Sequence, residues 1–111
     1  MIKQIKSSEI KNFLIDNKNV ELLDVRTPDE WDNIGKPDGE KIGLKTHFVT
    51  IIRSPEPSAN KDFIEEVKKI IDTNKELLVI CKAGGRSMMA SQLLSQEKIN
   101  CINISDGFEG N

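Results

Sequence analysis

One cysteine in this sequence, Cys81, has neighbours that suit a reactive thiol. It opens the run Cys81-Lys82-Ala83-Gly84-Gly85-Arg86-Ser87, which holds two cations and a pair of glycines. The thiolate is the reactive form of cysteine, and nearby cations and backbone N–H groups stabilise it. We therefore expect the pKa of Cys81 to lie below the free value of about 8.5 and the side chain to act as a nucleophile. Free cysteines are often small buried hydrophobic residues, but cations and glycines have no packing reason to crowd one thiol.

The residues on either side of this run predict a strand, a tight loop and a helix. The aliphatic residues from Leu77 to Ile80 predict a strand that is buried on both faces, as in parallel sheets. A helix is expected from near Ser87, with one apolar face formed by Met89, Ala90, Leu93 and Leu94. At the carboxyl end of a parallel strand the loop N–H groups meet the positive end of the helix dipole. An anion is therefore favoured where Cys81 lies.

A second strand is expected to deliver charged residues to the same edge of the sheet. Val20 to Val25 reads as this strand, and it brings Asp24 and Arg26 toward Cys81 if the strands are parallel. Thr27, Pro28 and Glu30 then form a capping box that predicts a short helix through Trp31.

The other segments predict further strands and helices in alternation. The expected elements are an edge strand at Ile2 to Ile5, a helix capped by Ser7-Ser8 with Ile10, Phe13 and Leu14 on one face, a long loop at Asn33 to Lys45, a strand at His47 to Ile52, a turn at Ser54 to Ser58, a helix capped by Asn60 with Phe63, Val67, Ile70 and Ile71 on one stripe, and a strand at Ile99 to Ile104. This alternation predicts an α/β domain with about five mostly parallel strands and helices on both faces.

Composition narrows the class of protein. The chain has 111 residues, a net charge of −2 and a pI near 5.4, so no basic face for direct nucleic-acid binding is expected. No stretch has the length of a membrane span or the apolar core of a signal peptide, and we expect a cytoplasmic protein with no membrane partner. Without a C-x-x-C pair, neither a zinc site nor a redox dithiol is indicated.

Three motifs together resemble the single-domain rhodanese family of sulfurtransferases. They are Leu22 to Trp31, Cys81 to Ser87, and Asp106-Gly107-Phe108-Glu109-Gly110. Relatives continue into a segment with a further tryptophan and a closing helix, whereas this sequence stops at Asn111, so we expect a single domain over residues 1–111 that lacks this segment. The second loop position, often arginine in the family, is Lys82, which keeps the charge but loses the bidentate fork.

The resemblance implies a rhodanese-like fold and a double displacement at Cys81. This residue would take a sulfur atom from a small anionic donor such as thiosulfate, hold it as a persulfide and pass it to a thiol, cyanide or a protein acceptor. The donor would be bound by Lys82, Ala83, Gly84, Gly85 and Arg86, with Asp24, Arg26 and Ser87 as support and without a metal or other cofactor.

Several residues have two readings. Arg86 either binds the donor or fixes the loop by pairing with a carboxylate such as Asp24, and the second role is favoured. Arg26 and Glu30 have the spacing of a pair at a helix start. Five other residues have the following expected roles: Trp31 lies in the core or the pocket wall, Cys101 is a structural thiol with a resolving role as its alternative, His47 is a strand or loop residue, and Met88 and Met89 serve in packing.

Two other functions compete with the sulfurtransferase. The domain could be a persulfide carrier or a regulatory module that binds another protein, since a carrier needs the same cysteine. A cysteine phosphatase also places a Cys and an Arg around an anion-binding loop. The four residues between Cys81 and Arg86 are one fewer than in such phosphatases, so this reading is less favoured.

Overall fold

The computed structural model describes residues 2–35, 44–53, 58–59, 62–71 and 74–108. Expected features at residues 36–43, 54–57 and 109–111, and the Asn60 cap, lie outside this part of the chain. The elements, in order, are β1 (Lys3–Ile5), the 3₁₀ helix η1 (Ser7–Glu9), α1 (Ile10–Asp16), β2 (Val20–Asp24), α2 (Pro28–Asn33), β3 (Thr46–Phe48), β4 (Ile52–Arg53), β5 (Ser58–Ala59), α3 (Phe63–Ile70), β6 (Glu76–Ile80), α4 (Gly85–Gln96) and β7 (Cys101–Ile104).

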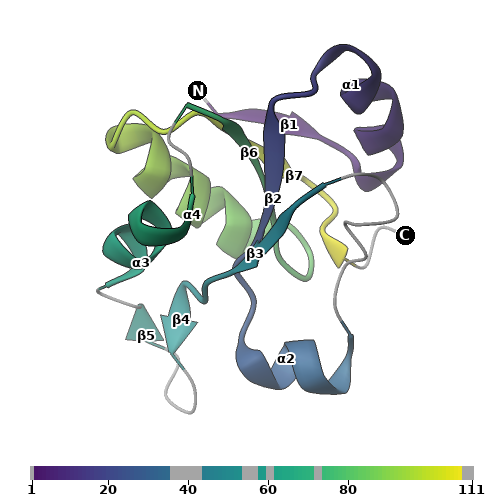
Figure 1. The fold of residues 1–111 in the computed structure, drawn as a ribbon. Coiled ribbons are helices and arrows are strands. Elements are labelled where there is room, and N and C mark those ends of the chain that lie inside the picture. Colours follow the sequence, from purple (N-terminus) through teal and green to yellow (C-terminus); the bar gives the residue numbers. More distant parts are fainter. Residues whose placement is uncertain (1, 36–43, 54–57, 60–61, 72–73, 109–111) are drawn as a thin grey trace.

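The strands form a parallel sheet of five, in the order β1-β7-β6-β2-β3, as the alternation of apolar runs predicts. A small antiparallel pair of β4 and β5 lies apart from it. The predicted α/β class is therefore confirmed. Because β2 and β6 are neighbours in register, Asp24 lies opposite Ile80, directly before Cys81. Figure 1 shows α2 beyond the carboxyl end of β2, next to this edge.

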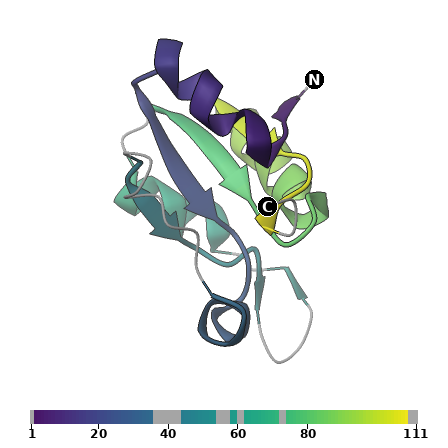
Figure 2. The same ribbon diagram turned by 90° about the vertical axis from the view of Figure 1, so that its right-hand side faces the viewer.

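Helices cover both faces of the sheet. One face, with Leu23, Leu77 and Val79, packs against Val67 of α3 and Leu94 of α4. The other face packs against α1 and is completed by residues such as Leu22, Leu78, Ile102, Ile10 and Phe13. The side view in Figure 2 separates α1 from the helices behind the sheet. Burial of the central strand β6 on both faces explains its uninterrupted apolar run from Leu77 to Ile80, and β2 is buried throughout as well although it contains Glu21 and Asp24.

The helix after Cys81 differs from its expected form. It begins at Gly85, earlier than expected, and its buried face consists of Ser87, Ala90, Ser91 and Leu94. Met89 and Leu93, expected on the apolar face, are 42% and 37% exposed. The buried face of α4 is therefore rotated relative to the predicted apolar face. Small serine side chains on the buried face let α4 lie close to β6 and β7, and Ser87 thereby reaches Cys81.

Other local expectations also need correction. The predicted strand from His47 to Ile52 is divided into β3 and β4, and Val49 and Ile51 between them are buried in the core with Phe63 and Val67 of α3. Asp62 lies directly before α3, and Ile70 at the end of this helix, expected on its buried stripe, is 44% exposed. Ser7 and Ser8 belong to η1, whose cap is Lys6. The capping box of Thr27 and Glu30 is confirmed, with α2 beginning at Pro28.

None of the helices in the described segments is long and apolar enough to cross a membrane.

Candidate active site

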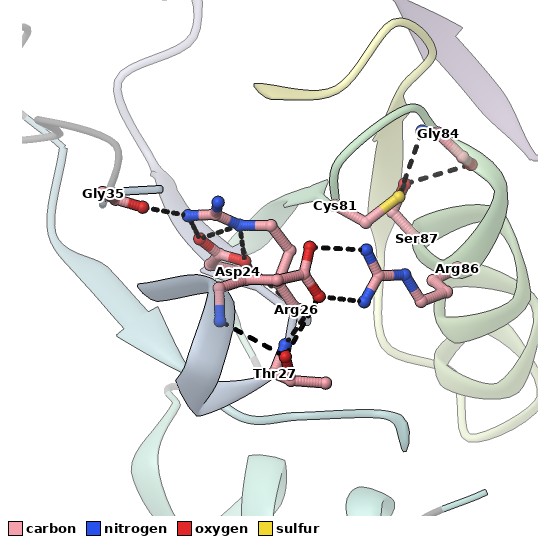
Figure 3. Close-up of polar contacts among 9 residues, drawn as sticks. Asp24, Arg26, Thr27, Gly35, Cys81, Gly84, Arg86 and Ser87 are labelled. Atoms are coloured by element: carbon pink, nitrogen blue, oxygen red, sulfur yellow. Dashed lines mark hydrogen bonds and ion pairs between the residues drawn. The ribbon is translucent and has the colours of Figure 1, made fainter. Parts of the chain in front are cut away.

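Cys81 lies in a tight loop between β6 and α4, with hydrogen-bond donors aimed at its sulfur. The backbone N–H of Gly84 lies 3.0 Å from Sγ, and the Ser87 hydroxyl lies 3.3 Å from it (Figure 3). The side chain is buried, and the residue is only 1% exposed. Cys81 also touches the aliphatic core, but its sulfur faces the donors of the loop.

The same donors account for the acidity of the thiol. Burial raises the pKa of Cys81, but hydrogen bonds from the Ser87 hydroxyl and from the N–H groups of Ser87, Gly84 and Ala83 outweigh burial and bring the pKa below its ordinary value. This lowering of the Cys81 pKa agrees with the expectation from the sequence. The cause is a set of neutral donors rather than the cations expected there, so the thiolate is stabilised mainly by the shape of the loop.

Gly84 is required by the loop for a steric reason. Its φ is +100°, and a Cβ built on it would lie 2.2 Å from the Ser105 carbonyl oxygen. Gly85 has open space at the same position. Only the first glycine of the pair is therefore needed for the turn that points the Gly84 N–H at sulfur.

Asn103 in β7 is a site residue that the sequence reading missed. It is 1% exposed, its Oδ1 shares the single proton of the Ser87 hydroxyl with the Cys81 sulfur, and its Nδ2 donates to the Gly84 carbonyl at 3.3 Å and to Gln4 Oε1 at 2.9 Å. It therefore holds both groups that contact Cys81. The available signal was an amide in a short apolar strand, since buried polar groups need partners.

The turn formed by Asp106, Gly107 and Phe108 packs against the backbone of the Cys81 loop. The Phe108 N–H donates to the Cys81 carbonyl at 2.8 Å. Gly107 has φ +60°, and a Cβ there would lie 2.5 Å from the carbonyl oxygens of Cys81 and Lys82. Asp106 accepts the Ser7 N–H at 2.8 Å, which ties this turn to the start of the chain.

Asp24 and Arg26 form a fully buried ion pair beside the loop. Arg26 Nη2 lies 2.8 Å from Asp24 Oδ2, both side chains are 0% exposed, and Arg26 also donates to the Gly35 carbonyl at 2.7 Å. The Phe108 ring stacks 4.3 Å from the guanidinium carbon. The expected pair of Arg26 with Glu30 is therefore wrong, because the side chain turns back toward the carboxylate at the end of its own strand.

Arg86 pairs with Glu30, and the expected partner Asp24 is wrong. The two side chains form parallel hydrogen bonds, with Nη2 at 2.8 Å from Oε2 (Figure 3). Asp24 is already occupied by Arg26, whereas α2 turns Glu30 toward the start of α4. Arg86 therefore fixes the loop to α2, the second of its two expected roles.

The other predicted residues lie at different places. Lys82, Ala83 and Gly85 are exposed on the outside of the loop. Trp31 is half-buried against Phe48, and His47 lies in β3 with Nε2 2.8 Å from Glu21 Oε1.

Met89 is exposed and Met88 half-buried on α4. In the described ranges no group of three or more His, Cys, Asp and Glu side chains is arranged to hold a metal ion.

Fold and site together define an α/β domain with a single activated cysteine at the carboxyl edge of a parallel sheet. The sequence matches the family model of the rhodanese-like domain over residues 7–110. The chain therefore belongs to the rhodanese-like domain family, whose activities are of the sulfurtransferase type or related to it.

Relatives and solved structures agree with this assignment. The uncharacterized protein RP600 of Rickettsia prowazekii is 33% identical over 112 residues, which cover 100% of this chain and 87% of that protein. The crystal structure of Rv0390 from M. tuberculosis has a TM-score of 0.86 and 29% identity, covering 98% of this chain and 81% of that one. A rhodanese-like domain protein from Staphylococcus aureus has a TM-score of 0.72, 23% identity and coverage of 98% and 90%, and supports the fold.

Proposed function

We propose that this chain is a sulfurtransferase that carries a sulfane sulfur on Cys81, with thiosulfate or a similar small anion as donor. The observation that supports it best is the pair of donors on the sulfur, the Gly84 N–H and the Ser87 hydroxyl. They stabilise the thiolate before it attacks and again when it leaves. Because Cys81 is 1% exposed, the donor must bring a narrow terminal atom to it, and a terminal sulfur meets this condition.

The reaction has two steps that balance without a cofactor. The Cys81 thiolate attacks the outer sulfur of thiosulfate, a bond forms between the two sulfurs, and sulfite leaves with the electron pair of the broken S–S bond. The acceptor, cyanide or a thiolate, then attacks the outer sulfur of the persulfide and returns the Cys81 thiolate. The exposed side of the loop, with Lys82 and the Ala83 backbone, is proposed to meet the anionic donor.

The test measures sulfur on the protein and turnover together. Protein incubated with thiosulfate is expected to gain the mass of one sulfur atom on Cys81 and to convert cyanide to thiocyanate. Cys81→Ser is expected to lose both, whereas the matched variant Cys101→Ser keeps both. Turnover that survives Cys81→Ser would reject the mechanism.

A persulfide carrier is the second candidate, in which a protein or thiol takes the sulfur. A carrier would gain the same sulfur atom but turn over cyanide slowly and lose the sulfur quickly only to its own acceptor. We place either reaction in the cytoplasm, where reducing conditions keep both free cysteines as thiols. A phosphatase is disfavoured because Glu30 already occupies the guanidinium of Arg86 that would bind phosphate. An assay with a generic aryl phosphate tests that point.

A further inference from the structure

The charged side chains that flank the Cys81 loop come in two matched pairs. Asp24 pairs with Arg26 beneath the loop, and Glu30 pairs with Arg86 at the first turn of α4. The Cys81 thiolate and the Arg86 guanidinium attract one another. The positive charge that attracts the thiolate is, however, already offset by the carboxylate of Glu30.

Glu30 is fixed in this position by its own helix. The Thr27 N–H and hydroxyl donate to Oε1 at 3.3 and 3.1 Å, and the Glu30 N–H donates to the Thr27 hydroxyl at 3.4 Å. Its side chain is 17% exposed and that of Arg86 is 23% exposed, so water screens the pair only in part. The hydrogen bond with Arg86 lowers the pKa of Glu30 to about 2, although burial acts against this. Glu30 thus stays ionised and in place at neutral pH.

This arrangement has a consequence for the charge of the sulfur donor. Thiosulfate brings two negative charges to the loop, whereas a hydropersulfide of an uncharged alkyl group, R–S–SH, brings at most one. The Glu30 carboxylate repels each donor in proportion to the charge of that donor. It also weakens the attraction between Arg86 and the donor. A carboxylate at this place therefore acts more strongly against the dianion.

We propose that Glu30 determines donor specificity, by lowering the use of small dianions relative to hydropersulfides. The inference rests on the proposed function and concerns the choice of donor at the same site. With a hydropersulfide, the Cys81 thiolate attacks the terminal SH sulfur, the new S–S bond forms, and R–S⁻ leaves with the electrons of the old one. The proton stays on the transferred sulfur, so neither oxidant nor reductant is needed.

Glu30→Gln is the variant that tests the charge. Glutamine is also accepted at this position of a capping box, so α2 keeps its start while the carboxylate charge is lost. Single-turnover sulfur uptake by Cys81 is measured by mass spectrometry, with thiosulfate and with a neutral alkyl hydropersulfide as donors. The ratio of the thiosulfate rate to the hydropersulfide rate is expected to rise about tenfold, with a steeper dependence on salt for thiosulfate.

Two further variants separate charge from shape. Thr27→Ala weakens the cap of α2 but leaves the carboxylate, and it is expected to keep the wild-type ratio. Glu30→Gln combined with Arg86→Gln removes both charges, and it is expected to return the ratio toward the wild-type value although absolute rates fall. A ratio within twofold of wild type in Glu30→Gln, or an equal rise in Thr27→Ala, would overturn the inference. No sulfur on Cys81 from either donor would instead reject the proposed function.

Discussion

The two cysteines of the chain lie at opposite ends of two adjacent strands. Cys81 follows the carboxyl end of β6, whereas Cys101 begins β7 opposite Leu77. Burial raises the pKa of both thiols. They differ in the direction of their hydrogen bonds, because the Cys81 sulfur accepts from Gly84 and Ser87 while Cys101 donates to the Ser91 carbonyl at 3.2 Å.

This difference decides which thiol is acidic. Accepted hydrogen bonds favour a thiolate, and the pKa of Cys81 is lowered in spite of burial. Burial dominates at Cys101 and raises its pKa, although a hydrogen bond from the Ser91 side chain acts against this, and repulsion by Glu76 adds to the effect of burial. Exposure alone points the wrong way, because Cys81 is the more deeply buried of the two. The orientation of donors around a sulfur is therefore the better guide to its reactivity.

The largest expected effect is a separation of the two titrations. With Cys101→Ser, the pH profile of iodoacetamide alkylation reports Cys81, and with Cys81→Ser it reports Cys101. We expect midpoints on opposite sides of the free value of about 8.5, with Cys81 below it and Cys101 above it. Both midpoints should return to the free value in urea. Equal or reversed midpoints in the folded protein would contradict the claim that folding lowers the pKa of Cys81 and raises that of Cys101.

The glycine pair tests the geometry that directs the donors. Gly84→Ala is expected to destabilise the protein by about 2–4 kcal/mol, because the residue has positive φ and its Cβ meets the Ser105 carbonyl. Gly85→Ala is the matched control, with open space at its Cβ, and is expected to be neutral or stabilising by up to about 1 kcal/mol. Urea unfolding measures both. Equal losses in the two variants would show that the tight turn is not the reason for the first glycine.

Two buried serines on α4 sharpen the comparison further. Ser87→Ala removes the hydroxyl from Cys81 and is expected to raise its alkylation midpoint by about one pH unit, since a hydrogen bond to a charged group contributes about 1.5–3 kcal/mol. Ser91 accepts the Cys101 thiol through its backbone oxygen, and a hydrogen bond from its side chain acts to lower the pKa of Cys101. Ser91→Ala should leave the Cys81 midpoint unchanged. An unchanged Cys81 midpoint in Ser87→Ala would remove the hydroxyl from the mechanism.

The fold and the position of Cys81 followed from the sequence because both depend on local patterns. Apolar runs such as Leu77 to Ile80 predict buried parallel strands, and Thr27, Pro28 and Glu30 predict the start of α2 from chemistry within one turn. A loop between a parallel strand and a helix then has to lie at the carboxyl edge. These inferences need no knowledge of distant contacts.

The pairing of charges could not be predicted in the same way. Asp24, Arg26, Glu30 and Arg86 allow two pairings, and the actual one depends on how α2 is turned toward α4. The role of Asn103 likewise depends on a contact between β7 and α4, and the rotation of α4 depends on packing that its apolar periodicity does not contain. Tertiary geometry decides each of these features.

The smallest effect is the contribution of each thiol to stability at alkaline pH. Because the pKa of Cys81 is lowered on folding, the unfolded chain holds this proton longer as pH rises, and stability increases between the folded and unfolded pKa values. Cys101 has a raised pKa, so it acts in the opposite direction above the unfolded value. The free energy of unfolding, measured with urea from pH 7 to pH 10, should therefore fall more in Cys81→Ser than in wild type and less in Cys101→Ser. Each slope should differ from the wild-type slope by at most about 1.4 kcal/mol per pH unit. Slopes that change in the same direction would mean that the two thiols do not differ in the way their hydrogen bonds require.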